Sequence, residues 1–467
     1  MFVKQFYTGC LSEAAYYIES EGEVAIIDPL RDTEEYLALS EERGSTIKYI
    51  FETHFHADFV SGHLDLSKQT GAPIIYGPNS ETTFKAHISR DGEIFKLGKL
   101  SIEAIHTPGH TLESTCYLLK DEKGKPYALF TGDTLFVGDV GRPDLSSGNM
   151  SGEELAGIMY DTIKNKIMPL SDDILVYPAH GAGSSCGKNL SSQTYSTIGE
   201  QKKTNYALQP QSREAFIKAV TEGLTSVPKY FPVNAKINME GYQSLDEVKQ
   251  NGLVPLTINE FKELLKQDAL LLDTRTAVSF SQGFIPGSIF IGLEGRFAEW
   301  AGTLLSFDKP LILITEQGKE EETIIRLSRV GFDKMKGYLS GGFNTWVNAG
   351  EKVDMIIDVE ADELAMDIPH DSNLLVVDVR RDGEFANAHI KDAMHLPLEE
   401  MTDILKLSQF EDHQNLYVHC GGGYRSVIAA SLLKRQGIHN LRNVLGGWNK
   451  IKEVKAIPVI REASVLN

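Results

Sequence analysis

The stretch THFHADFVSGH (residues 53–63) places two histidines and an aspartate directly after the apolar run Tyr49-Ile50-Phe51. In an extended chain residues i and i+2 point the same way, so His54 and His56 share one face. Three other β-like runs end in HTPGHT, TGDTLF and YPAHG, and the four stretches together present six potential metal ligands: His54, His56, Asp58, His110, Asp133 and His180. Such a set at the strand ends of one region predicts a metal centre, because a hydrogen-bonded core histidine accounts for one such residue but not for all of them.

The region around this stretch, residues 1–185, alternates short β-like runs with helical stretches. GEELAGIMYDTIKNKIM (152–168) carries apolar residues at helical spacing. Residues 186–245 show no obvious strand and are expected to add helices to the same domain.

Two later segments match each other, LLLDTRTAVSFSQGFIPGSIFI (270–291) and LLVVDVRRDGEFANAHIKDAMHL (374–396). Each runs from an apolar strand into Asp-x-Arg, and Asp273 and Asp378 lie 105 residues apart. The same offset separates Gly341 of LSGGFNTW from Gly446 of VLGGWNKI. One constant offset at both ends of a unit predicts a tandem duplication. Strands alternate with amphipathic helices in each copy, which is typical of β-α-β units around a parallel sheet.

Length, charge and composition argue against a nucleic-acid-binding, a membrane-spanning and a disulfide-rich protein. A chain of 467 residues is long enough for about three domains. Its net charge of −19 argues against a nucleic-acid partner. The sequence contains no apolar run of membrane-spanning length and no secretory h-region at the N-terminus, and four cysteines are too few for a disulfide scaffold. We therefore expect a cytoplasmic protein without a membrane partner.

A second reactive group lies in NLYVHCGGGYRSVIAASLLKRQG (415–437), where Cys420 follows an apolar strand and precedes a helix. Three glycines let the main chain curl around the sulfur, so that N–H groups, the helix N-terminus and Arg425 favour the nucleophilic thiolate. A buried packing cysteine requires no such loop. The corresponding loop of the first repeat reads TEQGKEEET (315–323), and no cysteine occurs between residues 187 and 419, so this repeat cannot carry a persulfide.

The motifs of the N-terminal region resemble those of the metallo-β-lactamase superfamily over about residues 1–245. The resemblance implies an αββα sandwich with metal between its sheets. In that family the first motif reads His-x-His-x-Asp-His and serves two metal positions, whereas this sequence has Phe59 in place of the last histidine. A phenyl ring cannot bind a metal and disfavours water and charge beside it, so a mononuclear site is the better interpretation.

The stretch LFTGDTLFVGDVGRPDL (129–145) is similar to the persulfide dioxygenase branch of that superfamily. This resemblance implies one Fe(II) per chain, held by His54, His110 and Asp133, with positions left open for substrate and O2. His56, Asp58 and His180 would then orient the ligands or hydrogen-bond to the substrate, although all six groups could instead hold metal. Spacing alone does not separate iron from zinc.

The second repeat resembles a rhodanese sulfurtransferase domain through VVDVR, EFANAHIKDAMHLPL and the cysteine loop. The resemblance implies that Cys420 accepts a sulfane sulfur as a persulfide, beside Arg425 and within a cradle formed by Gly421, Gly422, Gly423, Tyr424 and Ser426. Related phosphatases use Cys-x5-Arg, and the shorter spacing from Cys420 to Arg425 disfavours that activity. The predicted organisation is an N-terminal αββα domain (1–245), an inactive rhodanese-like domain (252–354) and an active one (357–462), both rhodanese-like domains being α/β with parallel sheets.

Two residues near the predicted metal centre have open roles. Cys186 lies six residues after His180 in the Gly/Ser-rich loop GAGSSCGKN. A sulfur relay or a contact with the substrate thiol is one interpretation, and an inert loop cysteine is the other. Arg142 is a candidate for the same substrate contact.

Together these features favour a protein that resembles bacterial fusions of a persulfide dioxygenase with a rhodanese, which detoxify sulfide. The expected reaction oxidises a low-molecular-weight thiol persulfide with O2 to sulfite and thiol, after which Cys420 passes sulfane sulfur to sulfite and gives thiosulfate. The sequence leaves open which thiol carries the persulfide and whether the chain forms homo-oligomers. One alternative is a di-zinc thioester hydrolase of the glyoxalase II type with an attached sulfurtransferase, against which Phe59 argues. Another is a sulfide-responsive carrier protein, against which the intact ligand set argues.

Overall fold

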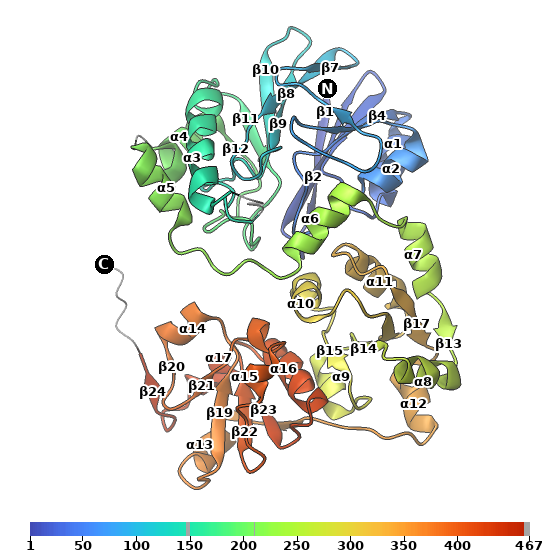
Figure 1. The fold of residues 1–467 in the computed structure, drawn as a ribbon, viewed down its shortest axis with the longest axis vertical. Coiled ribbons are helices and arrows are strands. Elements are labelled where there is room, and N and C mark those ends of the chain that lie inside the picture. Colours follow the sequence, from blue (N-terminus) through green and yellow to red (C-terminus); the bar gives the residue numbers. More distant parts are fainter. Residues whose placement is uncertain (146–149, 210, 462–467) are drawn as a thin grey trace. The chain divides into compact units, whose positions relative to one another are not determined.

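The computed structural model describes residues 1–145, 150–209 and 211–461 (Figure 1). The chain divides into two compact units. The first comprises residues 1–247 together with 325–333, and the second comprises the remainder. Within the described ranges, none of the helices combines the length and the apolar character that a membrane crossing requires.

The first unit is built on two six-stranded sheets. The first sheet has the order β1-β2-β3-β4-β5-β6 and the second has the order β12-β11-β10-β9-β8-β7. The strands of the first sheet are β1 (Phe2–Thr8), β2 (Glu13–Ser20), β3 (Glu23–Ile27), β4 (Thr46–Phe51), β5 (Ile74–Tyr76) and β6 (His87–Ile88). Those of the second are β7 (Ile94–Leu97), β8 (Leu100–His106), β9 (Thr115–Lys120), β10 (Pro126–Gly132), β11 (Leu175–Pro178) and β12 (Ser196–Thr197). The short β12 lies where the sequence indicated only helices.

Alternation along the strands creates three apolar layers, because successive side chains of a strand point to opposite faces of its sheet. In β2, Tyr16 and Ile18 belong to the core between the two sheets, where the Tyr16 ring meets the Phe130 ring at 4.9 Å. Ala15 and Tyr17 belong instead to a core on the outer face of the first sheet. The predicted αββα sandwich is therefore confirmed.

Helices cover both outer faces of this sandwich. The first sheet packs against α1 (Glu34–Arg43) and α2 (His63–Thr70), and the second packs against α3, α4 and α5. The remaining helical bounds of this part of the chain are α3 (Gly152–Thr162), the π-helical turn η1 (Ile163–Ile167), α4 (Ile198–Thr204), η2 (Tyr206–Leu208), α5 (Arg213–Thr221), α6 (Phe231–Glu240) and α7 (Leu245–Gly252). Helix α3 starts in a capping box formed by Ser151 and Glu154, which satisfies main-chain N–H groups that the first helical turn leaves without partners.

The second unit contains two five-stranded parallel sheets of the same topology, in the orders β13-β17-β16-β14-β15 and β18-β23-β22-β19-β21. The elements of the first repeat are β13 (Pro255–Leu256), α8 (Ile258–Lys266), β14 (Leu270–Asp273), α9 (Ala277–Gln282), β15 (Ile289–Phe290), α10 (Phe297–Leu304), β16 (Leu311–Ile314), α11 (Glu320–Ser328), β17 (Met335–Leu339) and α12 (Gly342–Asn348). Those of the second are β18 (Ile357–Val359), α13 (Ala361–Asp367), β19 (Leu374–Asp378), α14 (Asp382–Asn387), β20 (His389–Ile390), β21 (Met394–His395), η3 (Leu398–Glu400), α15 (Ile404–Leu407), β22 (Asn415–His419), α16 (Tyr424–Arg435), β23 (Leu441–Val444), α17 (Trp448–Ile451) and β24 (Val459–Ile460).

Matching contacts in the two repeats agree with the duplication. Arg275 forms a buried ion pair with Asp273 at 2.7 Å, and Arg380 forms the same pair with Asp378 at 2.6 Å. The two repeats also touch each other, since the Phe290 N–H donates to Ser431 Oγ at 3.0 Å.

Candidate functional site

The potential metal ligands lie at the ends of strands from both sheets of the sandwich. His54 follows β4 of the first sheet, whereas His110, Asp133 and His180 follow β8, β10 and β11 of the second. Gly132 makes the turn before Asp133 with a φ of 50°, and a Cβ at this position would collide with Thr53 Oγ1. Glycine is thus required where β10 ends beside the histidine loop. We call residues 53–61, which follow β4, the metal loop.

The six predicted ligands form two groups of three whose ligand atoms lie within 4.8 Å of one another. One group is His54, His110 and Asp133, and the other is His56, Asp58 and His180. Asp133 Oδ2 lies 3.5 Å from His110 Nε2 and 3.8 Å from His54 Nε2. Its second oxygen, Oδ1, lies 3.5 Å from His180 Nε2, so this carboxylate faces both groups.

Hydrogen bonds to the opposite ring nitrogens fix how the histidines point. His110 Nδ1 donates to the Arg142 carbonyl at 2.8 Å, and His180 Nδ1 donates to the Ser12 carbonyl at 3.2 Å. His54 Nδ1 lies 3.0 Å from Thr53 Oγ1, which itself donates to Asp28 at 2.9 Å. These partners leave each Nε2 as the free, lone-pair-bearing nitrogen, as metal-binding histidines require.

The polar atoms at the centre of this arrangement fit a bound metal. Both carboxylate oxygens of Asp133, Asp58 Oδ1 and His180 Nε2 are buried, with no hydrogen-bond partner in the described part of the chain. Buried polar atoms left unsatisfied are costly, and a cation bound between them would remove that cost. Burial and three neighbouring histidines lower the pKa of His54 well below its ordinary value, so its imidazole is neutral and able to coordinate.

His56 lies in a different environment from His54. Its Nε2 is 3.1 Å from Asp28 Oδ1 and 3.8 Å from Glu52 Oε2. Burial lowers the pKa of His56, but the carboxylates of Asp28, Glu52 and Asp58 outweigh this and raise it to about 10. The fully buried Phe59 ring packs on the His56 ring at 4.3 Å and lies 6.4 Å from that of His180. An aromatic side chain thus stands beside the second group of ligands.

The metal loop depends on residues that sequence reasoning missed. Asn238 of α6 donates to the carbonyls of His56 and Phe59 at 2.7 and 2.8 Å, and accepts from the Ser61 N–H at 2.9 Å. Asp28, which receives the Thr53 N–H at 2.7 Å, was detectable in principle because it follows β3, the strand paired in parallel with β4. Asn238 carries no such signal, since helix α6 is distant in sequence.

The side chains of Cys186 and Arg142 differ in whether they contact the potential metal ligands. Cys186 is buried and forms a group with Asp133 and His180 in which the ligand atoms lie within 4.8 Å. Burial, followed by the charges of Asp58 and Asp133, raises the pKa of the Cys186 thiol well above its usual value. The Arg142 guanidinium instead pairs with Asp144 at 2.8 Å and donates to the Thr225 carbonyl at 2.6 Å. Arg142 therefore approaches the metal ligands through its main-chain carbonyl and not through its charge.

The cysteine loop of the second repeat joins β22 to the N-terminus of α16. The Gly423 N–H donates to Cys420 Sγ at 3.1 Å, and Ser426 Oγ lies 3.6 Å from the same sulfur. Gly423 adopts a φ of 107°, a conformation that other residues rarely take. Main-chain N–H groups directed at the sulfur stabilise negative charge on it.

Cys420 opens into a cavity of about 490 Å³. Arg425 lines this cavity and forms a bidentate ion pair with Glu384, at 2.6 and 2.8 Å. Burial raises the pKa of Glu384, but Arg425 outweighs this and holds it below its ordinary value. The Tyr424 hydroxyl donates to the Gly292 carbonyl of the first repeat at 2.8 Å. Of the predicted cradle, Gly423 and Ser426 approach the sulfur, Gly422 and Tyr424 line the cavity, and Gly421 accepts the Asn449 N–H through its carbonyl.

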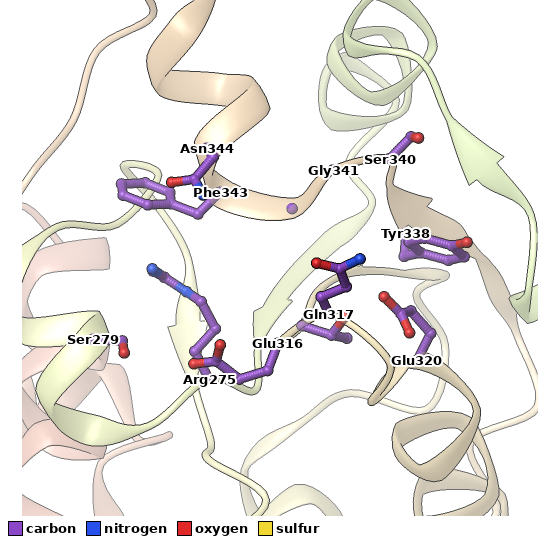
Figure 2. Close-up of a pocket in the computed structure, with 12 residues that line it drawn as sticks. Arg275, Ser279, Glu316, Gln317, Glu320, Tyr338, Ser340, Gly341, Phe343 and Asn344 are labelled. Atoms are coloured by element: carbon purple, nitrogen blue, oxygen red, sulfur yellow. The ribbon is translucent and has the colours of Figure 1, made fainter.

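The equivalent pocket of the first repeat has the opposite chemistry (Figure 2). The constant offset places Thr315 at the position of Cys420 and Glu320 at that of Arg425. Glu316, Gln317 and Glu320 point from the loop into this cavity of about 560 Å³. The Arg275 guanidinium stacks over the Phe343 ring at 4.2 Å. This pocket therefore has no cysteine thiol on its lining, and it has the acidic Glu320 where the cysteine loop has Arg425.

Comparison with known proteins identifies the families to which the parts of the chain belong. The family model "Metallo-beta-lactamase superfamily" matches residues 8–180, and the model "Rhodanese-like domain" matches residues 257–349 and 360–454. Over 209 residues the chain is 31% identical to "Persulfide dioxygenase ETHE1, mitochondrial" from Homo sapiens, which covers 44% of this chain and 74% of that one. Over 216 residues it is 28% identical to "Hydroxyacylglutathione hydrolase GloC" from Haemophilus influenzae, covering 42% of this chain and 91% of that one.

Among solved structures, the chain is similar to a crystal structure described as a metallo-beta-lactamase from Staphylococcus aureus subsp. aureus COL. The TM-score is 0.64 and the identity is 34%, over 73% of this chain and 98% of that one. The match agrees with the sandwich of β1 to β12. The chain therefore belongs to the metallo-β-lactamase superfamily, and two rhodanese-like domains follow its metallo-β-lactamase domain in the sequence.

Proposed function

We propose that this protein oxidises a low-molecular-weight thiol persulfide with O2 and transfers sulfane sulfur to the sulfite that is formed. The observation that carries the proposal is the buried group of His54, His110 and Asp133, whose carboxylate oxygens have no hydrogen-bond partner among the described residues. Phe59 stands beside the second ligand group, which favours one metal ion rather than two. Two imidazoles and one carboxylate are the facial ligand set of non-haem iron oxygenases.

The proposed oxidation converts RSSH, O2 and H2O into RSH, sulfite and two protons. A bound Fe(II) would supply the redox chemistry that this reaction with O2 needs. The chain's own contribution is to hold the ligand rings through the Arg142 carbonyl and Thr53, and to place the apolar Phe59 ring beside the site. Asp58 and His180, 3.5 Å apart, offer a buried acid and base pair next to the proposed ligands for orienting the substrate sulfur.

The second step of the proposal uses Cys420. Its thiolate attacks the outer sulfur of a persulfide, the S–S bond breaks, and the departing thiolate takes a proton. Sulfite then attacks the outer sulfur on Cys420, which releases thiosulfate and restores the thiolate. Splitting the transfer in this way is ordinary covalent catalysis, and one chain that holds both activities raises the local concentration of sulfite.

Metal analysis and O2 consumption test the first step. For protein purified without oxygen we expect about one iron per chain, and O2 uptake that starts when a thiol persulfide is added. Asp133→Asn and His110→Ala should lose both iron and O2 uptake. Iron-free wild-type protein that still consumes O2 with persulfide would contradict the proposal.

Cys420→Ser tests whether the oxidation and the sulfur transfer are separate steps. The variant should lose thiosulfate formation and keep persulfide-dependent O2 uptake, with sulfite accumulating in place of thiosulfate. Cys10→Ser is the matched control, because Cys10 lies in the first unit, where Arg329 donates to its sulfur at 3.8 Å. Loss of O2 uptake in Cys420→Ser would show that the two steps are not separate.

A second candidate function is thioester hydrolysis at two zinc ions. It is favoured by the group of His56, Asp58 and His180 and by relatives named as hydroxyacylglutathione hydrolases. Two zinc ions per chain, hydrolysis of a glutathione thioester and no O2 uptake with persulfide would establish this alternative in place of the dioxygenase.

A further inference from the structure

The first repeat keeps a cavity although it lacks the reactive cysteine. The cavity has a volume of about 560 Å³, and sites for small molecules typically have volumes of roughly 300–1,000 Å³. The residues that line it all belong to the second compact unit. Gly318 has a φ of 80° and Gly423, at the equivalent position of the second repeat, has a φ of 107°. The loop of the first repeat therefore keeps the glycine turn of the cysteine loop.

The ion pair on the lining of the second cavity has no counterpart in the first repeat. The constant offset places Ser279 at the position of Glu384 and Glu320 at that of Arg425. Arg425 and Glu384 pair with each other in the second repeat. Ser279 accepts a hydrogen bond from Thr276 and carries no charge that could compensate Glu320. The first repeat therefore has an acid without its base where the second repeat has a neutral pair.

Two carboxylates on the lining of the first cavity have no partner. The side chains of Glu316 and Glu320 form neither a hydrogen bond nor an ion pair with any residue that the structure describes. Arg275 is the other charged residue on the lining, and its guanidinium already pairs with the buried Asp273 at 2.7 Å. The charges of Arg275 and Asp273 cancel. The lining therefore carries two uncompensated negative charges, which attract a cation.

Two lysines near this loop have acidic partners of their own. Lys319 pairs with Glu322 at 2.7 Å, and Lys249 pairs with Glu321 at 2.6 Å. Neither lysine belongs to the lining of the cavity. The negative charge of the cavity is therefore left for a ligand.

A buried hydroxyl on the lining also lacks a partner. Thr315 takes the place of Cys420 and is 6% exposed. Its hydroxyl forms no hydrogen bond within residues 1–145, 150–209 and 211–461. A buried polar group without a partner is costly, and a ligand that donates an N–H to this oxygen would remove the cost. Thr315 thus points to a ligand with hydrogen-bond donors, independently of the two carboxylates.

The lining suits an organic cation better than a metal ion. Among the described residues, neither Glu316 nor Glu320 belongs to a group of three metal-ligating side chains. The two carboxylates are accompanied on the lining by the amides of Gln317 and Asn344 and by the half-buried ring of Tyr338 (Figure 2). An ammonium group donates up to three hydrogen bonds, and aromatic rings attract organic cations. Carboxylates, amides and an aromatic ring together are therefore suited to an amine.

We propose that the first repeat binds a small organic amine in this cavity. The ammonium groups of the ligand pair with Glu316 and Glu320, and one of them also donates to the Thr315 hydroxyl. The ring of Tyr338 packs against the carbon chain. This binding does not depend on the sulfur chemistry proposed above, because none of these residues takes part in it. The repeat that cannot carry a persulfide is thus a binding domain for a cationic ligand.

Isothermal titration calorimetry of the full-length protein at low ionic strength tests this proposal with three probes of equal chain length. These are 1,5-diaminopentane, which is a dication, 1,5-pentanediol, which is neutral, and glutarate, which is a dianion. We expect the diamine to bind at one site per chain, and the diol and glutarate not to bind. Glu320→Gln should weaken binding of the diamine about tenfold, because a charge-assisted hydrogen bond is lost. Glu263→Gln is the matched control, since it removes the same charge from helix α8 of this repeat, outside the cavity, and should leave the affinity unchanged.

Two further variants separate the charge from the hydroxyl. Glu320→Arg gives the loop the charge of the second repeat and should abolish binding of the diamine. Thr315→Val keeps the volume of the side chain and removes the hydroxyl, so affinity should fall by about threefold, less than in Glu320→Gln. Far-UV circular dichroism shows whether each variant is folded. The proposal would be overturned if wild-type protein did not bind the diamine, or if Glu263→Gln weakened binding as much as Glu320→Gln.

Discussion

The main-chain N–H of Val60 donates to the carbonyl of Arg329 at 2.7 Å, although the two residues lie in different predicted domains. Val60 directly follows Phe59 in the metal loop, and Arg329 directly follows helix α11. The Arg329 guanidinium also forms a bidentate ion pair with Asp32, at 2.6 and 2.7 Å. Residues 325–333 therefore complete the unit that holds the metal site, and the first repeat has a structural role there despite its missing nucleophile.

Arg31 also contacts residues 325–333, and the first prediction concerns the loss of its partner there. Its side chain is fully buried and pairs with Asp333 at 2.5 and 2.8 Å, and it also donates to the Ser328 carbonyl at 3.0 Å. Asp333→Ala would leave this buried guanidinium without its counter-charge. Breaking a buried pair costs about 3–5 kcal/mol, and we expect the lower part of this range because Asp333 is 19% exposed.

Urea denaturation monitored by far-UV circular dichroism measures this loss as an unfolding midpoint at a lower urea concentration. Asp268→Ala is the matched control, since its pair with Lys309 lies on the surface and such pairs contribute little to stability. Equal midpoints for the two variants would show that Arg31 does not need Asp333.

The sequence predicted the strands and the potential metal ligands of this site better than the residues that hold the metal loop in place. The αββα layers followed from alternation in strands such as β2, and the ligands followed from polar residues at strand ends, both of which are local signals. Asn238 and Arg329 were missed because each acts on the metal loop from far away in the sequence, Asn238 through its side-chain amide and Arg329 through its main-chain carbonyl. No local pattern marks such residues, and their partners are known only once the chain is folded.

Phe59→His tests whether the aromatic ring limits the site to one metal. The added imidazole would stand beside His56 and His180, and would complete the second ligand group with Asp58. We expect metal content to rise towards two ions per chain when zinc is supplied, with lower persulfide-dependent O2 uptake. Elemental analysis after dialysis against zinc measures this change. Phe59→Leu keeps an apolar side chain and should retain one ion, and two ions in that control would contradict the role given to the ring.

Thiol reactivity separates the two buried cysteines Cys116 and Cys420. Burial, opposed weakly by Thr107 and Thr134, raises the pKa of Cys116 to about 11. Only a small fraction of this thiol is ionised at pH 8, so we expect iodoacetamide to modify Cys420 within minutes while Cys116 remains unmodified. Timed quenching and peptide mass spectrometry measure both rates.

The raised pKa of Cys116 also makes the free energy of unfolding depend on pH. A cysteine in the unfolded chain ionises near pH 8.5, whereas folded Cys116 keeps its proton until about pH 11, so the unfolding free energy should decrease as the pH rises between these values. Cys116→Ser removes this contribution, and its stability should fall less over the same interval. An identical decrease in both proteins would assign the effect to other groups.

Thr315→Cys in a Cys420→Ser background asks whether a sulfur alone makes the first repeat active. Glu316 and Gln317 stand where the cysteine loop has glycines, and Glu320 stands where it has Arg425, so the new thiol would face negative charge in place of main-chain N–H groups (Figure 2). Negative charge disfavours thiolate, bound persulfide and approaching sulfite alike. We expect no thiosulfate formation above that of Cys420→Ser, and no sulfane sulfur released by cyanide. Adding Glu316→Gly, Gln317→Gly and Glu320→Arg should restore part of the transfer, whereas transfer by the single Thr315→Cys change would show that the loop chemistry is not what inactivates this repeat.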